Sequence, residues 1–288
     1  MASILVTGTS KGIGLITALT LARAGHTVYA TMRSPARAPE LARQTSQERL
    51  PITITAMDVD SDDSVNTAMA SIYQSAGTID VLVNNAGIER SGSIEELPME
   101  DFRATMETNY FGAVRCIKAV IPQMRQRKSG CIINVTSVAG RIATTPLGPY
   151  AASKHALEAV SEVLAQEVRA FNIRVAIVEP GIIDTPMAHE IEKNKPVSLY
   201  PHQRRMAAYF AASLKNGTQP ILVAEKIQSI IERGTWQLRH PVGPDAKPML
   251  ASRKATSDED YIALHSLDDD TWYNIMEARS GMNLRPRK

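Results

Sequence analysis

The sequence predicts a doubly wound α/β fold, in which helices cover both faces of one parallel sheet. Short apolar runs alternate with longer segments of helical pattern along most of the chain. The first run, residues 3–7, enters a glycine-rich turn at 8–14, and a helical pattern follows over 15–24 and stops at Gly25. Such alternation favours a parallel sheet, because successive parallel strands need crossover helices.

Bulk composition limits the function classes. The chain has 288 residues, 44% hydrophobic and 22% charged, with a net charge of +2. These values are ordinary for a globular protein and give no reason to expect a nucleic acid or an anionic membrane as partner. No run of about 18 apolar residues is present, so we expect no spanning helix. We treat residues 1–288 as one catalytic domain.

The two cysteines and six histidines point to no disulfide framework and no metal site. Cys116 and Cys131 lie in segments that read as a helix and a strand, and the histidines lack metal-ligand spacing. A reducing compartment follows. The first strand begins too early to leave room for a signal peptide, so the sequence predicts a cytoplasmic protein.

The glycine-rich turn predicts a phosphate site. Glycines allow the backbone to approach a diphosphate, and the N-terminus of the following helix offers N–H donors and a positive dipole. The spacing is G-x-x-x-G-x-G, from Gly8 through Gly12 to Gly14. A tight strand-to-helix turn without a ligand is the alternative.

The end of the second strand, residues 26–32, predicts which cofactor binds. An NAD site places a carboxylate here, on the ribose 2′-hydroxyl. This chain instead has Arg33, and Lys11 lies in the glycine turn. Both cations suit a 2′-phosphate, so the sequence favours NADP over NAD. The alternative is that Arg33 is a solvated loop residue.

Further strands are expected at 52–57, 79–83, 131–135, 173–178 and 236–240, with helices at 36–48, 99–127, 149–170 and 220–233. Asp58 follows the third strand, where it either forms a turn or contacts an adenine. The amides of Asn84 and Asn85 follow the fourth strand and can bond neighbouring backbone. Asn109 lies inside the helix 99–127, which Pro122 is expected to kink.

A trio of polar side chains predicts carbonyl chemistry. Tyr150 and Lys154 are four positions apart and share a helix face, while Ser137 ends the fifth strand. A free tyrosine has a pKa of about 10, and we expect the ammonium group to lower it toward the working range of an acid–base catalyst. Taken alone, Tyr and Lys at this spacing are also common neighbours on a helix surface.

Two segments lie outside the repeating pattern. Residues 186–219 are long for a connection and carry scattered apolar side chains, which predicts a lid over an apolar pocket. The tail, residues 243–288, is expected to form one or two short helices that pack on the domain or on another subunit.

Together these markers resemble the short-chain dehydrogenase/reductase family, over residues 3 to about 240. The motifs are Thr7-Gly8-x-x-x-Gly12-Ile13-Gly14, Asp58, Asn84-Asn85-Ala86-Gly87, Asn109, Ser137, Tyr150-x-x-x-Lys154 and Pro180-Gly181 with Thr185. The resemblance implies a Rossmann-type sheet of order 3-2-1-4-5-6-7. Within the family, the second strand and the tail look most like hydroxysteroid and retinol dehydrogenases.

By that resemblance Tyr150 is the general acid/base, Ser137 orients the substrate oxygen, Lys154 bonds the nicotinamide ribose and Asn109 holds a relay water. Met187 is assigned to the substrate together with Ser137 and Tyr150. The implied cofactor-binding residues are Gly8, Ser10, Lys11, Gly12, Ile13, Gly14, Arg33, Asp58, Val59, Asn85, Ala86, Gly87, Tyr150, Lys154, Pro180, Gly181, Ile183 and Thr185.

The resemblance implies an NADP-dependent oxidoreductase that interconverts an alcohol and a ketone or aldehyde on an apolar, steroid- or retinoid-like small molecule. It also implies a homodimer or homotetramer. Two alternatives remain open. One is a redox sensor that binds NADP without turnover, and the other is an epimerase or dehydratase that uses the same tyrosine and lysine.

Overall fold

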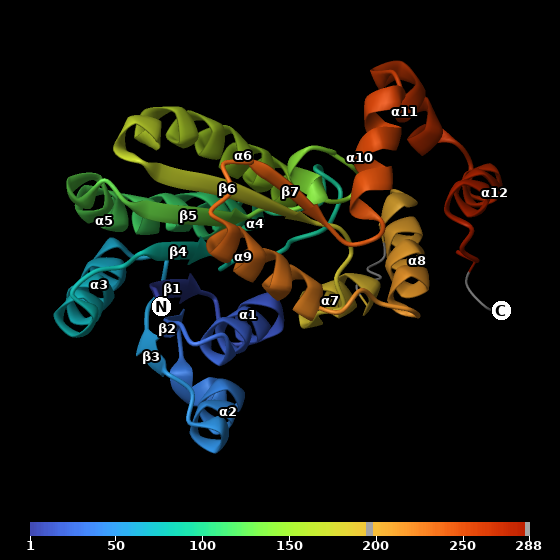
Figure 1. The fold of residues 1–288 in the computed structure, drawn as a ribbon. Helices are drawn as coiled ribbons and strands as arrows, with labels where there is room; N and C mark the ends of the chain where they lie inside the picture. Colours follow the sequence, from blue (N-terminus) through green and yellow to red (C-terminus); the bar gives the residue numbers. More distant parts are fainter. Residues whose placement is uncertain (194–197, 286–288) are drawn as a thin grey trace.

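A computed structural model describes residues 1–193 and 198–285 of the chain. Its centre is a parallel sheet with the strand order β3-β2-β1-β4-β5-β6-β7, which confirms the predicted order (Figure 1). The strands are β1 (Ser3–Thr7), β2 (Thr27–Met32), β3 (Ile52–Ala56), β4 (Val81–Asn84), β5 (Gly130–Val135), β6 (Ile173–Pro180) and β7 (Arg239–Val242).

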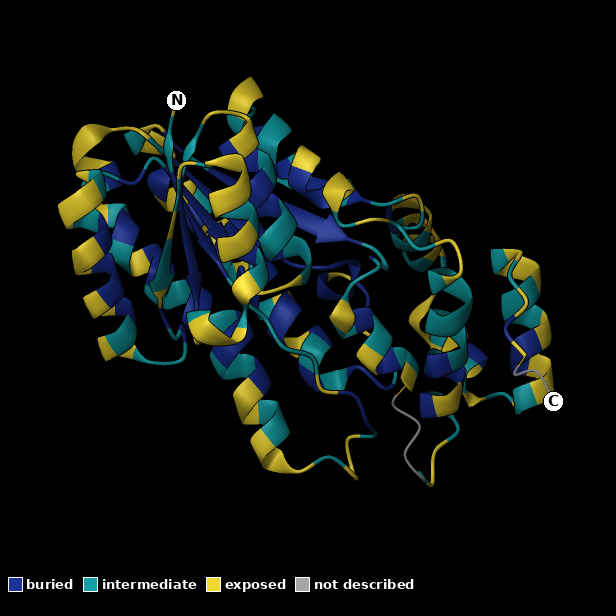
Figure 2. Cartoon of the chain, turned by 90° about the horizontal axis from the view of Figure 1, so that it is seen from below, coloured by how far each residue is buried: buried dark blue, intermediate teal, exposed yellow. Residues whose placement is uncertain are grey.

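Alternate residues of each central strand face opposite sides of the sheet. Each set belongs to one of two apolar cores, one on either face. Ile4 and Val6 pack with α1, α2 and α9, whereas Leu5 packs with α3, α5 and α6. Figure 2 shows that the buried residues are concentrated on the sheet and on the inward faces of the helices. These helices are α1 (Gly12–Arg23), α2 (Pro39–Glu48), α3 (Asp62–Ala76), α5 (Gly112–Arg127), α6 (Gly148–Val168) and α9 (Ile221–Arg233).

The predicted helix over 99–127 is three pieces in the structure. α4 (Met99–Met106) passes into a π turn, η2 (Glu107–Phe111), before α5 begins. The helix continues through Pro122 to Arg127, so the proline does not end it. The irregular turn lies instead at Asn109, whose side chain bonds groups outside its own helix.

The last strand and the tail differ from the prediction. The strand covers Arg239–Val242 instead of 236–240. Trp236 precedes it and stacks against Arg169, with 3.7 Å from the guanidinium carbon to the ring centroid. The tail forms three helices, not one or two. They are α10 (Ala246–Ala255), α11 (Asp258–Ser266) and α12 (Asp269–Ser280).

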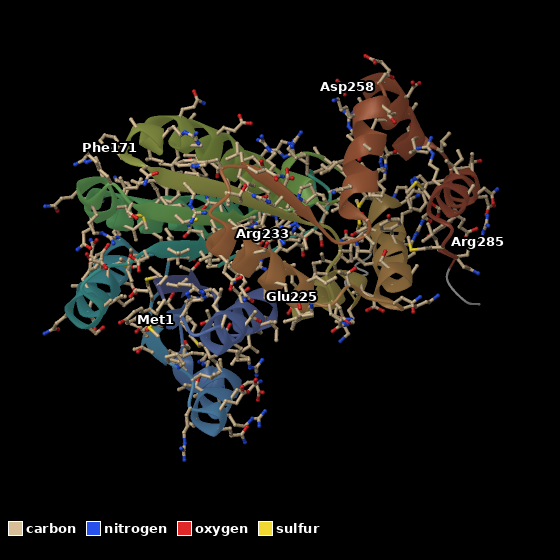
Figure 3. All side chains as sticks on the ribbon, in the orientation of Figure 1. Met1, Phe171, Glu225, Arg233, Asp258 and Arg285 are labelled. Atoms are coloured by element: carbon tan, nitrogen blue, oxygen red, sulfur yellow. The ribbon has the colours of Figure 1, made fainter. Side chains whose placement is uncertain are left out.

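The segment 186–219 contains α7 (Pro186–Lys193) and α8 (His202–Leu214), while residues 194–197 of this predicted lid lie outside the described residues. Trp272 of α12 packs against α8, and the buried Arg205 of α8 donates to the carbonyl oxygens of His265 and Leu267. Figure 3 shows Asp258 and Arg285 on this outer helical layer, far from Met1. None of the helices in the described ranges is long and apolar enough to cross a bilayer.

Ser61 shows how local sequence begins a helix. Its side chain accepts a hydrogen bond from the Ser64 N–H at the start of α3. We expect Ser61→Ala to lower the free energy of unfolding by about 1 kcal/mol, because one N–H of the first turn loses its acceptor. Urea unfolding checks this. Ser71→Ala, an exposed serine inside the same helix, is the control and is expected to leave stability unchanged or slightly higher.

Candidate active site

A cavity of about 1040 Å³ opens at the carboxyl ends of the strands. Such ends are where open α/β sheets bind ligands. Every residue that the sequence assigned to cofactor or substrate lines this cavity, from Gly8 in the first turn to Met187 in α7. Asn109, which was assigned to a relay water, does not line the cavity, and its side chain is buried. The structure therefore gathers residues from the whole length of the sheet into one site.

The glycine turn is built so that no side chain fills it. A Cβ on Gly14 would lie 2.3 Å from the Gly8 carbonyl oxygen, and Gly12 has a φ of +59°. α1 begins here without a side-chain cap and without an acidic residue in its first turn. Its first N–H groups are therefore free to bind an anion, and the site fits a dinucleotide diphosphate.

Asn85 holds this turn against the next strand. Its Nδ2 donates to the carbonyl oxygens of Thr7 (3.0 Å) and Gly8 (3.1 Å), as expected for an amide at the sheet edge. The backbone N–H groups of Asn85 and Ala86 donate to the Thr7 hydroxyl. Asn84 lies deeper, where its Nδ2 donates to Asn134 Oδ1 at 2.9 Å. The side-chain amides of Asn84 and Asn85 therefore hold together the strands and the turn that surround the cavity.

Charged groups surround the end of the cavity at β2. Arg33 is exposed and forms no hydrogen bond or ion pair within the described residues. Asp58 Oδ1 accepts from the Asp60 N–H, so Asp58 forms a turn as well as lining the cavity. Burial raises the pKa of Asp60, and the charge of Arg33 opposes that shift. Lys11 reaches Glu190 at 3.3 Å in an exposed pair.

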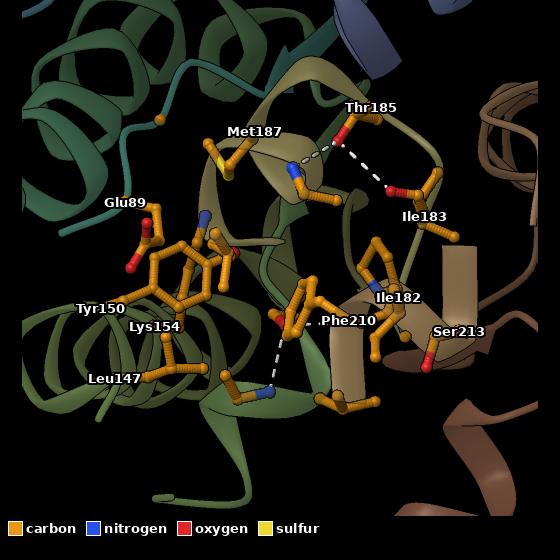
Figure 4. A pocket seen from close by; sticks show the side chains of 18 of the residues that line it. Glu89, Leu147, Tyr150, Lys154, Ile182, Ile183, Thr185, Met187, Phe210 and Ser213 are labelled. Atoms are coloured by element: carbon orange, nitrogen blue, oxygen red, sulfur yellow. Dashed lines mark hydrogen bonds between the residues drawn. The ribbon is translucent and has the colours of Figure 1, made fainter. Parts of the chain in front are cut away.

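Ser137, Tyr150 and Lys154 line the cavity at its opposite end. Figure 4 shows Lys154 beside the Tyr150 ring. The Ser137 hydroxyl caps the turn after β5 by accepting from the Ala139 N–H at 3.1 Å. The same hydroxyl donates to the Pro180 carbonyl oxygen at 3.4 Å, and its interaction with Tyr150 acts to lower the pKa of the phenol. Lys154 is 4% exposed, and its Nζ donates to the Val135 carbonyl oxygen at 3.0 Å. That nitrogen lies 5.6 Å from the centroid of the Tyr150 ring.

The expectation of a lowered Tyr150 pKa is wrong for this structure, in which the net shift is upward. Burial raises the pKa of Tyr150 to about 12, which outweighs the opposing hydrogen bond with Ser137, and the charge of Glu89 raises it further. Burial lowers the pKa of Lys154 to about 8, while the charge of Glu158 acts in the opposite direction. Desolvation dominates both groups because the pocket wall encloses them.

Asn109 joins three parts of the site from within the π turn. Its Oδ1 accepts from the Ile88 N–H at 2.8 Å, and its Nδ2 donates to the Ile88 carbonyl oxygen and to Ser153 Oγ, each at 2.9 Å. Because these bonds use both ends of the amide, a relay water at this position would depend on the backbone of the π turn.

The loop after β6 and helix α7 form another wall. Pro180, Gly181 and Ile183 line the cavity, and the Thr185 hydroxyl accepts from the Ala188 N–H at 3.4 Å to cap α7. The sequence analysis missed Asp245, whose Oδ2 accepts from the Ile182 N–H at 2.7 Å and so ties the tail to this loop. No motif marks Asp245, because the contact joins residues 63 positions apart.

Besides Ser137, Tyr150 and Met187, which the sequence assigned to the substrate, further side chains line this end of the cavity. Leu147 and Phe210 line the cavity together with Met187 and add apolar surface. In Figure 4 they lie in the lower half of the view, and Met187 lies above Tyr150. Glu89 adds a carboxyl group near Tyr150. Glu89 follows the Asn84-Asn85-Ala86-Gly87 motif but is not part of it, so nothing in the sequence alone marked this residue.

Comparisons with known proteins agree with this geometry. The family model described as short chain dehydrogenase matches residues 2–196. An NADPH-dependent pterin aldehyde reductase from Arabidopsis thaliana is 36% identical over 75% of this chain and 88% of that protein. Retinol dehydrogenase 8 from Bos taurus is 37% identical over 69% of this chain and 64% of that protein.

A solved structure has the same fold over nearly the full length. The crystal structure of a short-chain dehydrogenase from Streptomyces avermitilis superposes with a TM-score of 0.77 at 29% sequence identity. The superposition covers 96% of this chain and 97% of that one. The similarity therefore includes the segments after residue 196 that the family model does not match.

Proposed function

The chain belongs to the short-chain dehydrogenase family and is an oxidoreductase of alcohols and carbonyls, and from that premise we propose that it uses NADP(H) on an apolar substrate with Tyr150 as acid/base. The observation that carries the proposal is the placement of Ser137, Tyr150 and Lys154 in the same cavity as the glycine turn. A diphosphate on the turn and a carbonyl beside the phenol fit in one continuous space.

The roles follow from the chemistry of each side chain. When bound, the nicotinamide supplies or accepts the hydride. Tyr150 gives a proton to the carbonyl oxygen during reduction, and its raised pKa keeps that proton in place at neutral pH. Ser137 donates a hydrogen bond to the same oxygen. Lys154, held by Val135, places a cation beside the phenolate that forms.

The preference for NADP rests on Arg33 and Lys11. Both line the cavity at the end that an adenosine ribose would occupy, and no described residue accepts a hydrogen bond from the Arg33 guanidinium. A guanidinium group binds phosphate through two parallel hydrogen bonds. The NADPH dependence in the name of the Arabidopsis relative supports the same cofactor.

Removal of Arg33 tests the cofactor proposal. We expect Arg33→Ala to reduce the ratio of kcat/KM for NADPH to that for NADH by roughly 10- to 150-fold, because one charge-assisted interaction is lost. Steady-state kinetics with both cofactors measures this ratio. Arg37→Ala, an exposed arginine outside the cavity, is the matched control and should leave the ratio unchanged. A similar ratio in Arg33→Ala and wild type would contradict the proposal.

The apolar lining supports an apolar substrate, with Met187, Leu147 and Phe210 near the reacting end. We propose that residues 186–219 act as its lid and that 243–288 supports the lid through the contacts of α8. The exposed Phe111 and Val163 offer apolar surface for a homodimer or homotetramer. A reducing, cytoplasmic location fits the two buried free cysteines.

A substrate screen tests the proposal as a whole. We expect loss of NADPH absorbance at about 340 nm with apolar ketones or aldehydes, each oxidised cofactor matched by one alcohol formed. Cofactor binding without oxidation would favour the sensor, and product isomers without net oxidation would favour the epimerase.

A further inference from the structure

Glu89 is a carboxyl group at the reacting end of the cavity that none of the proposed steps uses. It follows the Asn84–Gly87 segment after β4 and lines the cavity. Figure 4 shows it on the Tyr150 side of the site, while Ile183 and Thr185 lie on the other side. Its charge acts on Tyr150 directly. Glu89 is therefore placed toward the substrate and away from the loop proposed to hold the nicotinamide.

The hydrogen bonding of Glu89 is incomplete. An interaction with the Ser91 side chain acts to lower the pKa of the carboxyl group. One carboxyl oxygen, Oε1, is buried and has no hydrogen-bond partner among the described residues. The neighbouring Arg90 does not complete it, because its guanidinium pairs with Asp101 at 3.1 Å and donates to the Glu89 carbonyl oxygen. A buried carboxylate oxygen without a donor is unfavourable, and a ligand that donates a hydrogen bond to it would relieve that cost.

The surrounding charges favour a cationic donor. Glu190 also lines the cavity, and the two carboxylates repel each other. Burial raises the pKa of Glu89 to about 7, so its ionised form is poorly stabilised at neutral pH. An ammonium group would stabilise the ionised form of Glu89 and offset its repulsion by Glu190. A hydroxyl group would only donate the missing hydrogen bond.

We propose that the site prefers ketones or aldehydes with an ammonium group on the carbon next to the carbonyl, paired with Glu89, and an apolar remainder. We place the ammonium group next to the carbonyl because Tyr150 is proposed to bind the carbonyl oxygen and the charge of Glu89 acts on Tyr150. The apolar remainder would contact Leu147, Met187 and Phe210. This inference rests on the proposed function and names its substrate class.

The test compares three ketones of equal chain length, an α-methylamino ketone, the α-hydroxy ketone and the unsubstituted ketone. We expect wild type to prefer the amino ketone in kcat/KM by roughly 10-fold or more, and Glu89→Gln to abolish that preference, as expected for loss of one charge-assisted bond. The unsubstituted ketone should change by less than about 3-fold, within the range of a neutral substitution in a pocket. In Glu100→Gln, which removes an exposed carboxylate outside the cavity and serves as the matched control, the preference for the amino ketone should remain as in wild type.

Three results would overturn the proposal. They are no preference in wild type, a preference for the hydroxy ketone, or an equal loss for all three ketones in Glu89→Gln. The same comparison can be made without turnover. Calorimetry measures the affinity of the three ketones for the NADPH complex of Tyr150→Phe, and the measurement is repeated with Glu89→Gln added. If wild type reduces no ketone, the proposed function fails, while the calorimetric preference still decides the role of Glu89.

Discussion

The Tyr150→Phe variant is expected to reduce kcat by roughly 100- to 10,000-fold, the range for loss of a general acid. The phenol is the one side chain of the cluster that both donates a proton and faces the proposed carbonyl position. Phe keeps the ring, so the pocket wall and the contact with Lys154 should persist. Binding of NADPH, measured by its fluorescence, should change by less than about 3-fold, because no cofactor charge is lost.

The control for this variant is Tyr73→Phe. The Tyr73 hydroxyl donates to the Ala119 carbonyl oxygen at 3.1 Å, between α3 and α5 and outside the cavity. We expect Tyr73→Phe to lower stability by about 1 kcal/mol and to leave kcat unchanged. Wild-type turnover in Tyr150→Phe with a panel of accepted ketones would refute the assignment of the acid.

The second large effect is expected for Lys154→Met. Met fills nearly the same space but removes the buried cation beside Tyr150 and its bond to Val135. We expect kcat/KM to fall by roughly 100- to 1,000-fold, the range for loss of one preorganised electrostatic group. Weaker NADPH binding should accompany the loss, because Lys154 is also proposed to hold the nicotinamide ribose.

His155→Gln is the matched control for Lys154→Met. His155 is the next residue on α6 but is exposed, and its Nδ1 lies 2.8 Å from the Ala151 carbonyl oxygen. We expect its kinetic constants to equal those of wild type. Comparable losses in His155→Gln and Lys154→Met would indicate damage to α6 and would contradict a specific role for the ammonium group.

The fold and the cofactor side of the site could be predicted because their signals are local. Ile4, Leu5 and Val6 form one short apolar run, and the glycines that follow occupy positions where a Cβ would collide or the backbone requires a positive φ. Parallel strands then align their carboxyl ends, which brings distant motifs such as Tyr150-x-x-x-Lys154 to the same edge.

The other features of the site could not be predicted, because they depend on contacts between residues that are distant in the sequence. The pKa of Tyr150 is set by burial that no spacing reveals, and its direction was predicted wrongly. Asp245 acts through the Ile182 N–H, far along the chain. α10 buries only Ala246, so its apolar pattern is weak. Glu89 shows no pattern at all, and its importance appears only where the chain folds it beside Tyr150.

Transfer of label from cofactor to product tests the central claim most directly. The measurement uses NADPH carrying deuterium on the transferable position of nicotinamide C4, an accepted ketone and mass spectrometry of the product. The account predicts one deuterium on the carbinol carbon for each NADPH consumed by the wild-type enzyme. Tyr150→Phe should give the same labelled product at a strongly reduced rate. An unlabelled alcohol, or an isomerised product with the labelled cofactor regenerated, would contradict it.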